Sequence, residues 1–159
     1  MLLKILLSLL LIGLSSGSVL AAPDVQSLID TGNRQWSEGK TSEAEISFKQ
    51  AISADPGSAN AYSRLASLYL TENRLDEAIS NYQEAIMRDA ENPRLFLAVS
   101  VAYLHQAHYE MAQAMVQQAL ELDPQLEDAL KVQEYIRIKQ KTLKEAERTE
   151  QSDKPEAHP

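Results

Sequence analysis

The chain has 159 residues, no cysteine and a formal net charge of -8, from 15 lysines and arginines against 23 aspartates and glutamates. This length is typical of one domain, and the lack of cysteine excludes disulfides, thiolate metal sites and cysteine nucleophiles. Because a negative chain repels a polyanion, we expect no nucleic-acid partner.

The charge is distributed unevenly along the chain. Residues 24–130 carry 7 basic and 17 acidic side chains, whereas residues 131–159 carry 7 basic and 6 acidic ones. An acidic surface keeps a protein soluble and also attracts basic partners by electrostatic steering. Solubility is the simpler interpretation of this excess.

Residues 1–21 have the features of a secretory signal peptide. Lys4 precedes the uncharged, mostly apolar run 5–14, and small residues follow, so we expect cleavage after Ala21 or Ala22. An uncleaved membrane anchor is the alternative, but the run is much shorter than the ~20 residues that span a bilayer. We therefore expect export without stable membrane insertion: to the periplasm in a two-membrane bacterium, and otherwise by secretion.

From residue 25 onward the sequence repeats with a period of 34 residues. The matching columns are Gly32, Ala66 and Ser100; Ala44, Ala78 and Ala112; Phe48, Tyr82 and Val116; and Ala51, Ala85 and Ala119. We assign residues 22–24 to a short extension, 25–58 to repeat 1, 59–92 to repeat 2 and 93–126 to repeat 3.

Each repeat is expected to form two helices joined by a short polar turn. The two apolar stripes of the second repeat, both at helical spacing, are Tyr62, Leu65, Ala66 and Tyr69, and then Leu75, Ala78, Tyr82, Ala85 and Ile86. In the first repeat Gly39 lies where the first helix should stop. Ser42 and Glu45 have the spacing of a capping box for the second helix.

The repeated columns have a steric explanation. Antiparallel helices approach closely only where a small side chain faces a larger one, so the columns of Ala44 and Gly32 keep the pair tight. The large side chains of the Phe48 column then fill the space between neighbouring repeats, and no repeat buries its apolar face alone. Pro56 and Pro124 end second helices, because proline lacks the amide donor and clashes with the preceding turn.

These columns resemble those of the tetratricopeptide repeat family over residues 25–126. The departures are Gln35 in place of an aromatic residue, Thr31 in place of a leucine-like one, and Ala90 in place of proline. The resemblance implies an all-α fold, a right-handed α-solenoid of stacked helix-turn-helix repeats. It also implies that the first helices line a concave groove that holds peptides or extended segments of other proteins.

Residues 127–148 are expected to form a capping helix. Ala129, Val132, Ile136 and Leu143 recur at helical spacing, and charged residues occupy the other side, as the exposed end of a repeat array requires. We expect residues 149–159 to be disordered, since they are polar, contain proline and have nothing to bury.

A second stripe on each first helix is the candidate binding groove, by the same resemblance. It contains Gln26, Ile29, Asn33 and Trp36; Asn60, Ser63, Ser67 and Leu70; Arg94, Leu97, Val101 and Leu104; and Asp128, Lys131, Tyr135 and Ile138. The apolar members predict an interaction surface, with the single tryptophan as an anchor. The alternatives are that the chain's own tail or a second copy fills the groove.

One familiar use of such grooves is disfavoured. Family members that clamp a carboxylate terminus carry lysine, asparagine and arginine at set groove columns, and Ile29 and Ala98 occupy two of these columns here. Asn33 and Arg94 alone would make a weak clamp.

No catalytic motif is found, and we predict neither enzyme activity nor a cofactor. His105 and His108, with Glu110 nearby, have a metal-ligand spacing, but they fall at an interhelix turn, where solvated histidines are common. The Gly39–Thr41 segment lacks the partner glycine of a phosphate loop and follows a predicted helix, not a strand.

The sequence thus predicts an exported, non-enzymatic scaffold that holds an extended or helical segment of another protein, within an envelope assembly or secretion complex. The alternative is a self-associating structural subunit that uses the same groove or the capping helix, so a homo-oligomer is possible.

Overall fold

The computed structural model describes residues 24–152, all of them helix or short connection, so the all-α prediction is confirmed. The predicted signal peptide and residues 153–159 lie outside the described part. The helices are α1 (Val25–Ser37), α2 (Thr41–Ala54), α3 (Ala59–Thr71), α4 (Leu75–Arg88), α5 (Pro93–His105), α6 (Tyr109–Leu122) and α7 (Glu127–Ser152).

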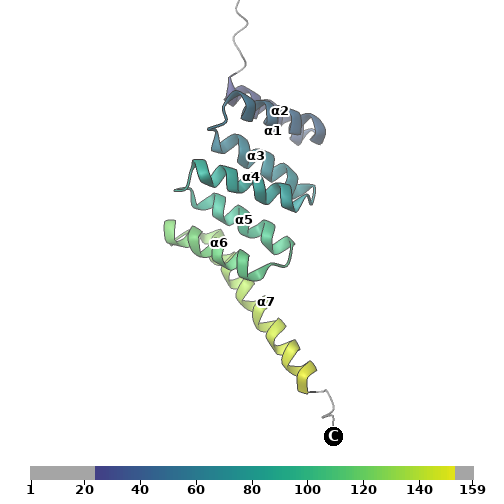
Figure 1. The fold of residues 1–159 in the computed structure, drawn as a ribbon, viewed down its shortest axis with the longest axis vertical. Coiled ribbons are helices and arrows are strands. Elements are labelled where there is room, and N and C mark those ends of the chain that lie inside the picture. Colours follow the sequence, from purple (N-terminus) through teal and green to yellow (C-terminus); the bar gives the residue numbers. More distant parts are fainter. Residues whose placement is uncertain (1–23, 153–159) are drawn as a thin grey trace, which may run out of the picture.

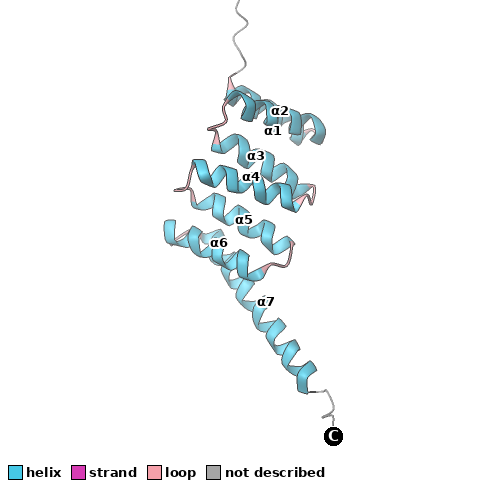
Figure 2. Cartoon of the chain, in the orientation of Figure 1, coloured by secondary structure: helices cyan, strands magenta, loops and turns pink. Residues whose placement is uncertain are grey.

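The helices form a stack of antiparallel pairs that ends in one long helix (Figures 1 and 2). Within each pair the two helices pack together, and the second helix also packs on the first helix of the next pair. In addition, α1, α3, α5 and α7 contact one another in succession, so the first helices of all the units share one side of the stack. None of the helices between residues 24 and 152 is both long and apolar enough to cross a membrane.

The stack depends on a close approach between the two helices of a pair. Gly32 of α1 lies against Phe48 of α2, which is fully buried, and a Cβ built on Gly32 would come within 2.5 Å of the Phe48 ring. The first and third pairs differ in how they fill this space, because Gly32 faces the ring of Phe48 in the first pair, whereas the third pair has the larger Ser100 and the smaller Val116 in the same columns.

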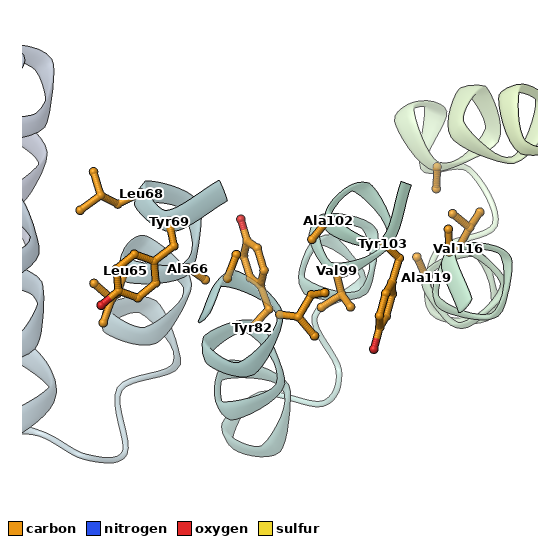
Figure 3. Packing of buried hydrophobic residues seen from close by; sticks show 14 of the residues in the cluster. Leu65, Ala66, Leu68, Tyr69, Tyr82, Val99, Ala102, Tyr103, Val116 and Ala119 are labelled. Atoms are coloured by element: carbon orange, nitrogen blue, oxygen red, sulfur yellow. The ribbon is translucent and has the colours of Figure 1, made fainter. Parts of the chain in front are cut away.

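The core runs without a break between the pairs. Figure 3 shows Leu65, Ala66 and Tyr69 of α3 and Tyr82 of α4 in the same layer of buried side chains that continues to Val116. All members of the predicted alanine columns are fully buried, as the sequence predicted.

The turn inside each pair uses one residue in the left-handed backbone region. These residues are Gly39 (φ 76°), Asn73 (φ 59°) and Ala107 (φ 58°), which lie 34 residues apart. The residue after each of them donates its amide to a carbonyl five residues earlier, at 2.9 Å in all three turns. Glycine and asparagine adopt this conformation readily, whereas alanine is strained in it.

The capping-box prediction for Ser42 and Glu45 is wrong. Helix α2 has Lys40 at its N-cap, so Ser42 already lies inside the first turn. The Glu45 carboxylate instead accepts hydrogen bonds from Lys49 Nζ (2.6 Å), Tyr69 Oη (2.9 Å) and Arg74 Nη1 (2.8 Å). Two of these donors belong to the second repeat, and their attraction draws the side chain away from the helix start.

Glu45 therefore joins the first two repeats. Its partial burial by itself raises the pKa, but the hydrogen bonds from Lys49, Arg74 and Tyr69 outweigh this effect and lower the pKa to about 2. The Arg74 guanidinium also stacks on the Tyr69 ring, 4.0 Å from its centroid.

The last helix is longer than predicted. We expected order to end at residue 148, but α7 continues to Ser152, where it reaches the end of the described residues. No proline or glycine interrupts residues 127–152, and the Thr149 hydroxyl bonds to the carbonyl oxygens of Glu145 and Ala146. The helix therefore projects beyond the stack (Figure 1).

The outer side of α7 is polar. In the earlier first helices, the equivalent positions pack against the second helix of the same pair. Gln133, Glu134 and Arg137 occupy the columns of Val99, Ser100 and Tyr103. Glu134 accepts two hydrogen bonds from the Arg137 guanidinium, at 2.7 and 2.6 Å. A polar outer side can face water without being covered by another helix, and this is the property of a capping helix.

Replacement of Gly32 by alanine should destabilise the protein by ~1–3 kcal/mol, because the added methyl group overpacks against Phe48. Helix propensity alone predicts the opposite sign. Urea denaturation of Gly32→Ala, Phe48→Leu and the double variant measures the coupling. The double variant should lose less than the sum of the single losses, and a Gly32→Ala protein as stable as the wild type would contradict the packing described here.

Replacement of Ala107 by glycine should raise the free energy of unfolding by ~0.5–1 kcal/mol, because the strained left-handed conformation is relieved. The matched control is Ala114→Gly, at an exposed position inside α6, which should lower the free energy of unfolding by ~1 kcal/mol. Both values come from thermal or urea denaturation. A loss of stability in Ala107→Gly would show that the alanine is not strained.

The Glu45 contribution should disappear in acid. Because its folded-state pKa of about 2 lies below the ordinary value of 4.5, the stabilisation is complete above about pH 5 and is lost as the pH falls towards 2. We expect Glu45→Gln to cost about 2 kcal/mol at pH 7 and much less near pH 2.5. Glu43→Gln, on the exposed side of α2, is the control, and a pH-independent cost for Glu45→Gln would oppose this account.

Candidate peptide-binding groove

The predicted groove residues fall on one side of the first helices, but their exposure differs. Gln26, Asn60, Arg94, Lys131, Tyr135 and Ile138 are exposed, and Asn33, Trp36, Ser63, Ser67, Leu70, Leu97, Val101 and Leu104 are half-buried. Because these positions recur every 34 residues and the first helices touch in succession, they form one continuous surface across α1, α3, α5 and α7.

Ile29 does not belong to that surface. Its side chain is only 2% exposed and packs in a small core cluster with Ala51 and Ala61. Ala61 lies in the first turn of α3, so the second repeat covers Ile29. The prediction that Ile29 lines the groove is therefore wrong.

Trp36 belongs both to the groove and to the core. Its ring meets Phe48 edge-on, with centroids 6.5 Å apart and an interplanar angle of 87°. With Asn33, Ser37 and Arg64 it also lines a surface hollow of about 320 Å³. Because part of the ring packs on Phe48, its removal would weaken folding as well as any binding.

A second hollow of about 380 Å³ lies between α3 and α5. Most of its lining residues carry a polar group, namely Asn60, Ser63, Arg64, Ser67, Tyr82, Asn92 and Arg94, and Leu95 and Ala98 complete it. Tyr82 reaches it from α4, and its hydroxyl lies 2.9 Å from Ser67 Oγ. Burial raises the pKa of Tyr82 against the smaller, opposing effects of Ser67 and Arg64, so the phenol stays protonated at neutral pH.

Arg64 is shared by the two hollows and has no carboxylate partner among residues 24–152. Arg94, which lines the hollow between α3 and α5, likewise has no carboxylate partner among these residues. By contrast, Arg74 and Arg88 of the second repeat each contact a glutamate at 2.8 Å or less. Arg64 was missing from the predicted set, although the 34-residue register places it in line with Ala98, one of the carboxylate-clamp columns.

The apolar part of the surface lies towards the ends of α3 and α5 and along the middle of α7. Leu70 and Leu104 pack partly on the core, whereas Tyr135 and Ile138 of α7 remain 48% and 50% exposed. Lys139 Nζ lies 5.5 Å from the centre of the Tyr135 ring. This row can bury apolar side chains of a partner.

The two histidines singled out in the sequence lie at the predicted turn. His105 ends α5 and His108 immediately precedes α6, where its ring tilts against Tyr103. Within residues 24–152 no three histidine, aspartate or glutamate side chains are grouped closely enough to hold a metal ion.

Two models of the tetratricopeptide repeat match the sequence, one over residues 29–94 and the other over residues 69–134. The chain belongs to the tetratricopeptide repeat family. The two matches together span most of the helical stack, so the resemblance drawn from the repeated columns is confirmed.

Two characterised proteins share part of this tetratricopeptide sequence. The general transcriptional corepressor ssn6 of Schizosaccharomyces pombe is 29% identical over 82 residues, which are 50% of this chain and 7% of that protein. The type IV pilus assembly protein PilF of Pseudomonas aeruginosa is 30% identical over 84 residues, 53% of this chain and 33% of PilF. The similarity thus spans a third or less of either relative.

The stack also resembles solved tetratricopeptide domains. The second such domain of human RPAP3, solved in complex with the HSP70 peptide SGPTIEEVD, superposes with a TM-score of 0.67 and 25% identity, over 71% of this chain and 94% of that domain.

Proposed function

We propose that this protein is a binding scaffold that holds an extended or helical segment of another protein on the surface formed by α1, α3, α5 and α7. The observation that carries the proposal is the row of incompletely buried apolar side chains along these helices, beside two hollows of about 320 and 380 Å³. The peptide bound by the RPAP3 domain supports it.

Burial of apolar surface supplies the binding energy. Leu70, Leu104, Tyr135 and Ile138 keep part of their surface in water, and each Å² of apolar area that a partner covers contributes ~25 cal/mol. The rigid backbone of the stack lowers the ordering cost on this side of the interface, because the surface exists before the partner arrives. We infer that the chain acts by binding and not by catalysis, as is general in its family.

The place of action in this proposal is outside the cytoplasm. Support comes from residues 1–21, whose basic start, apolar run and small residues have the pattern of a signal peptide. The similarity to a pilus assembly protein supports a role in an envelope assembly complex, where a scaffold of this size would hold one component beside another.

The test is site-specific photocrosslinking in intact cells. A photoreactive amino acid at Leu104 or Ile138 should capture one contiguous segment of a partner, identified by mass spectrometry. The same group at Met87, which is 69% exposed on α4, is the matched control and should not capture it.

A second substitution measures how much one apolar side chain of the groove contributes to partner capture. Ile138→Ser, at a half-exposed position, should reduce capture from Leu104 about fivefold and leave the melting temperature nearly unchanged. Equal capture from Leu104 and Met87 would refute the groove, and capture of a second copy of this chain would favour self-association.

A further inference from the structure

The groove surface has two chemically different edges. The polar edge, near the starts of α3 and α5, consists of Asn60, Ser63, Arg64 and Arg94. The apolar edge, near the ends of α1, α3 and α5 and at the middle of α7, consists of Trp36, Leu70, Leu104 and Ile138. With a rise of 1.5 Å per residue, the two edges lie about 9 Å apart between Arg64 and Leu70 on α3 and about 15 Å apart between Arg94 and Leu104 on α5.

The centre of the polar edge carries positive charge that nothing in the described chain neutralises. Arg64 and Arg94 both line the hollow between α3 and α5, and neither forms an ion pair within residues 24–152. The carboxylates nearest to the groove are already engaged: beside the hollow, Asp89 accepts a hydrogen bond from Asn92 at 3.1 Å, and two more lie towards the ends of the groove. Asp30 accepts a hydrogen bond from Gln26 at 2.8 Å, and Asp128 pairs with Lys131 at 3.1 Å.

The hollow itself is lined by hydrogen-bond donors and contains no carboxylate. Besides the two guanidinium groups, Asn60 offers an amide group, whereas the Ser63 hydroxyl already donates to the Asn60 carbonyl and the Asn92 amide to Asp89. A carboxylate placed there would accept charge-assisted hydrogen bonds, which are the strong ones. The hollow is thus locally positive, although the whole chain has a net charge of -8.

The position of the hollow favours a side-chain carboxylate over the end of a chain. It lies in the middle of the stack, and Arg64 connects it to the hollow at Trp36. On the other side the surface continues over α5 to Tyr135 of α7, since α5 and α7 are in contact. A bound chain has room to continue in both directions.

We propose that the partner segment is extended and two-sided: its acidic side chains bind Arg64 and Arg94, and its alternate, apolar side chains cover the apolar edge. Successive side chains of an extended chain point to opposite sides, which matches two edges about 9 to 15 Å apart. This proposal rests on the proposed function and specifies the chemistry of its partner. The positive centre, which the net charge does not reveal, selects acidic segments.

The test is selection from a bead-displayed library of random ten-residue peptides with acetylated and amidated ends, which removes terminal charges. On the wild-type protein, the bound peptides should be enriched in Asp or Glu at positions that alternate with aliphatic or aromatic residues. On Arg64→Gln/Arg94→Gln, the acidic enrichment should vanish while the apolar enrichment persists. Peptides selected on the wild type should bind this variant about tenfold more weakly.

The matched control is Arg34→Gln/Arg148→Gln, which removes the same charge from exposed positions that line neither hollow. It should select the same peptides as the wild type, and thermal denaturation verifies that both double variants are folded. A third variant, Arg94→Glu, should shift the selection towards lysine and arginine.

The outcomes separate the two proposals. If the wild type enriches no peptide, the groove function itself fails. If it enriches apolar peptides without acidic residues, or if the acidic preference survives in Arg64→Gln/Arg94→Gln, only the charge assignment fails. Loss of acidic selection in the Arg34 and Arg148 control would also overturn it, because net charge would then be the cause.

Discussion

The structure depends on how closely the two helices of a pair can approach. At Gly32 a helix backbone lies against the ring of Phe48, with no room for a methyl group between them. The third pair meets the same constraint with Ser100 in place of glycine and the smaller Val116 in place of phenylalanine, while the second pair combines Ala66 with Tyr82. Ala66 and Ser100 are fully buried, at Gly32 a buried ring takes the space, and the first helices contact one another in succession on one side of the stack.

Polar interactions then join the pairs, and they pair particular charged side chains with one another. Glu45 binds Tyr69 and Arg74 across the boundary between repeats 1 and 2, and Arg88 is held by Glu84 in the second repeat. The arginines on α3 and α5 that face the groove are left without such partners. The acidic excess of the chain is thus a property of the whole sequence and not of the surface to which a partner would bind.

Core and groove share the same helices, which limits how freely the groove can vary. Trp36 contacts Phe48 with one edge and lines a hollow with the rest of its ring, and Tyr82 fills the core while its hydroxyl reaches the polar edge. Arg64, Arg94 and Ile138, by contrast, lie on the surface and can change with little effect on stability. Partner selection can therefore be tuned at these positions without loss of the stack.

The sequence alone determined the period of 34, the helix pairs, the columns of small and large residues and the face that each groove residue shares, because these follow from helical spacing and side-chain size. Tertiary structure decided the rest. Ile29 is buried because Ala61 of the next repeat covers it, and Glu45 leaves its own helix start because Tyr69 and Arg74 attract it. The polar hollow exists because Arg64, Tyr82 and Arg94 meet from three helices, a contact between distant parts of the chain that no local spacing encodes.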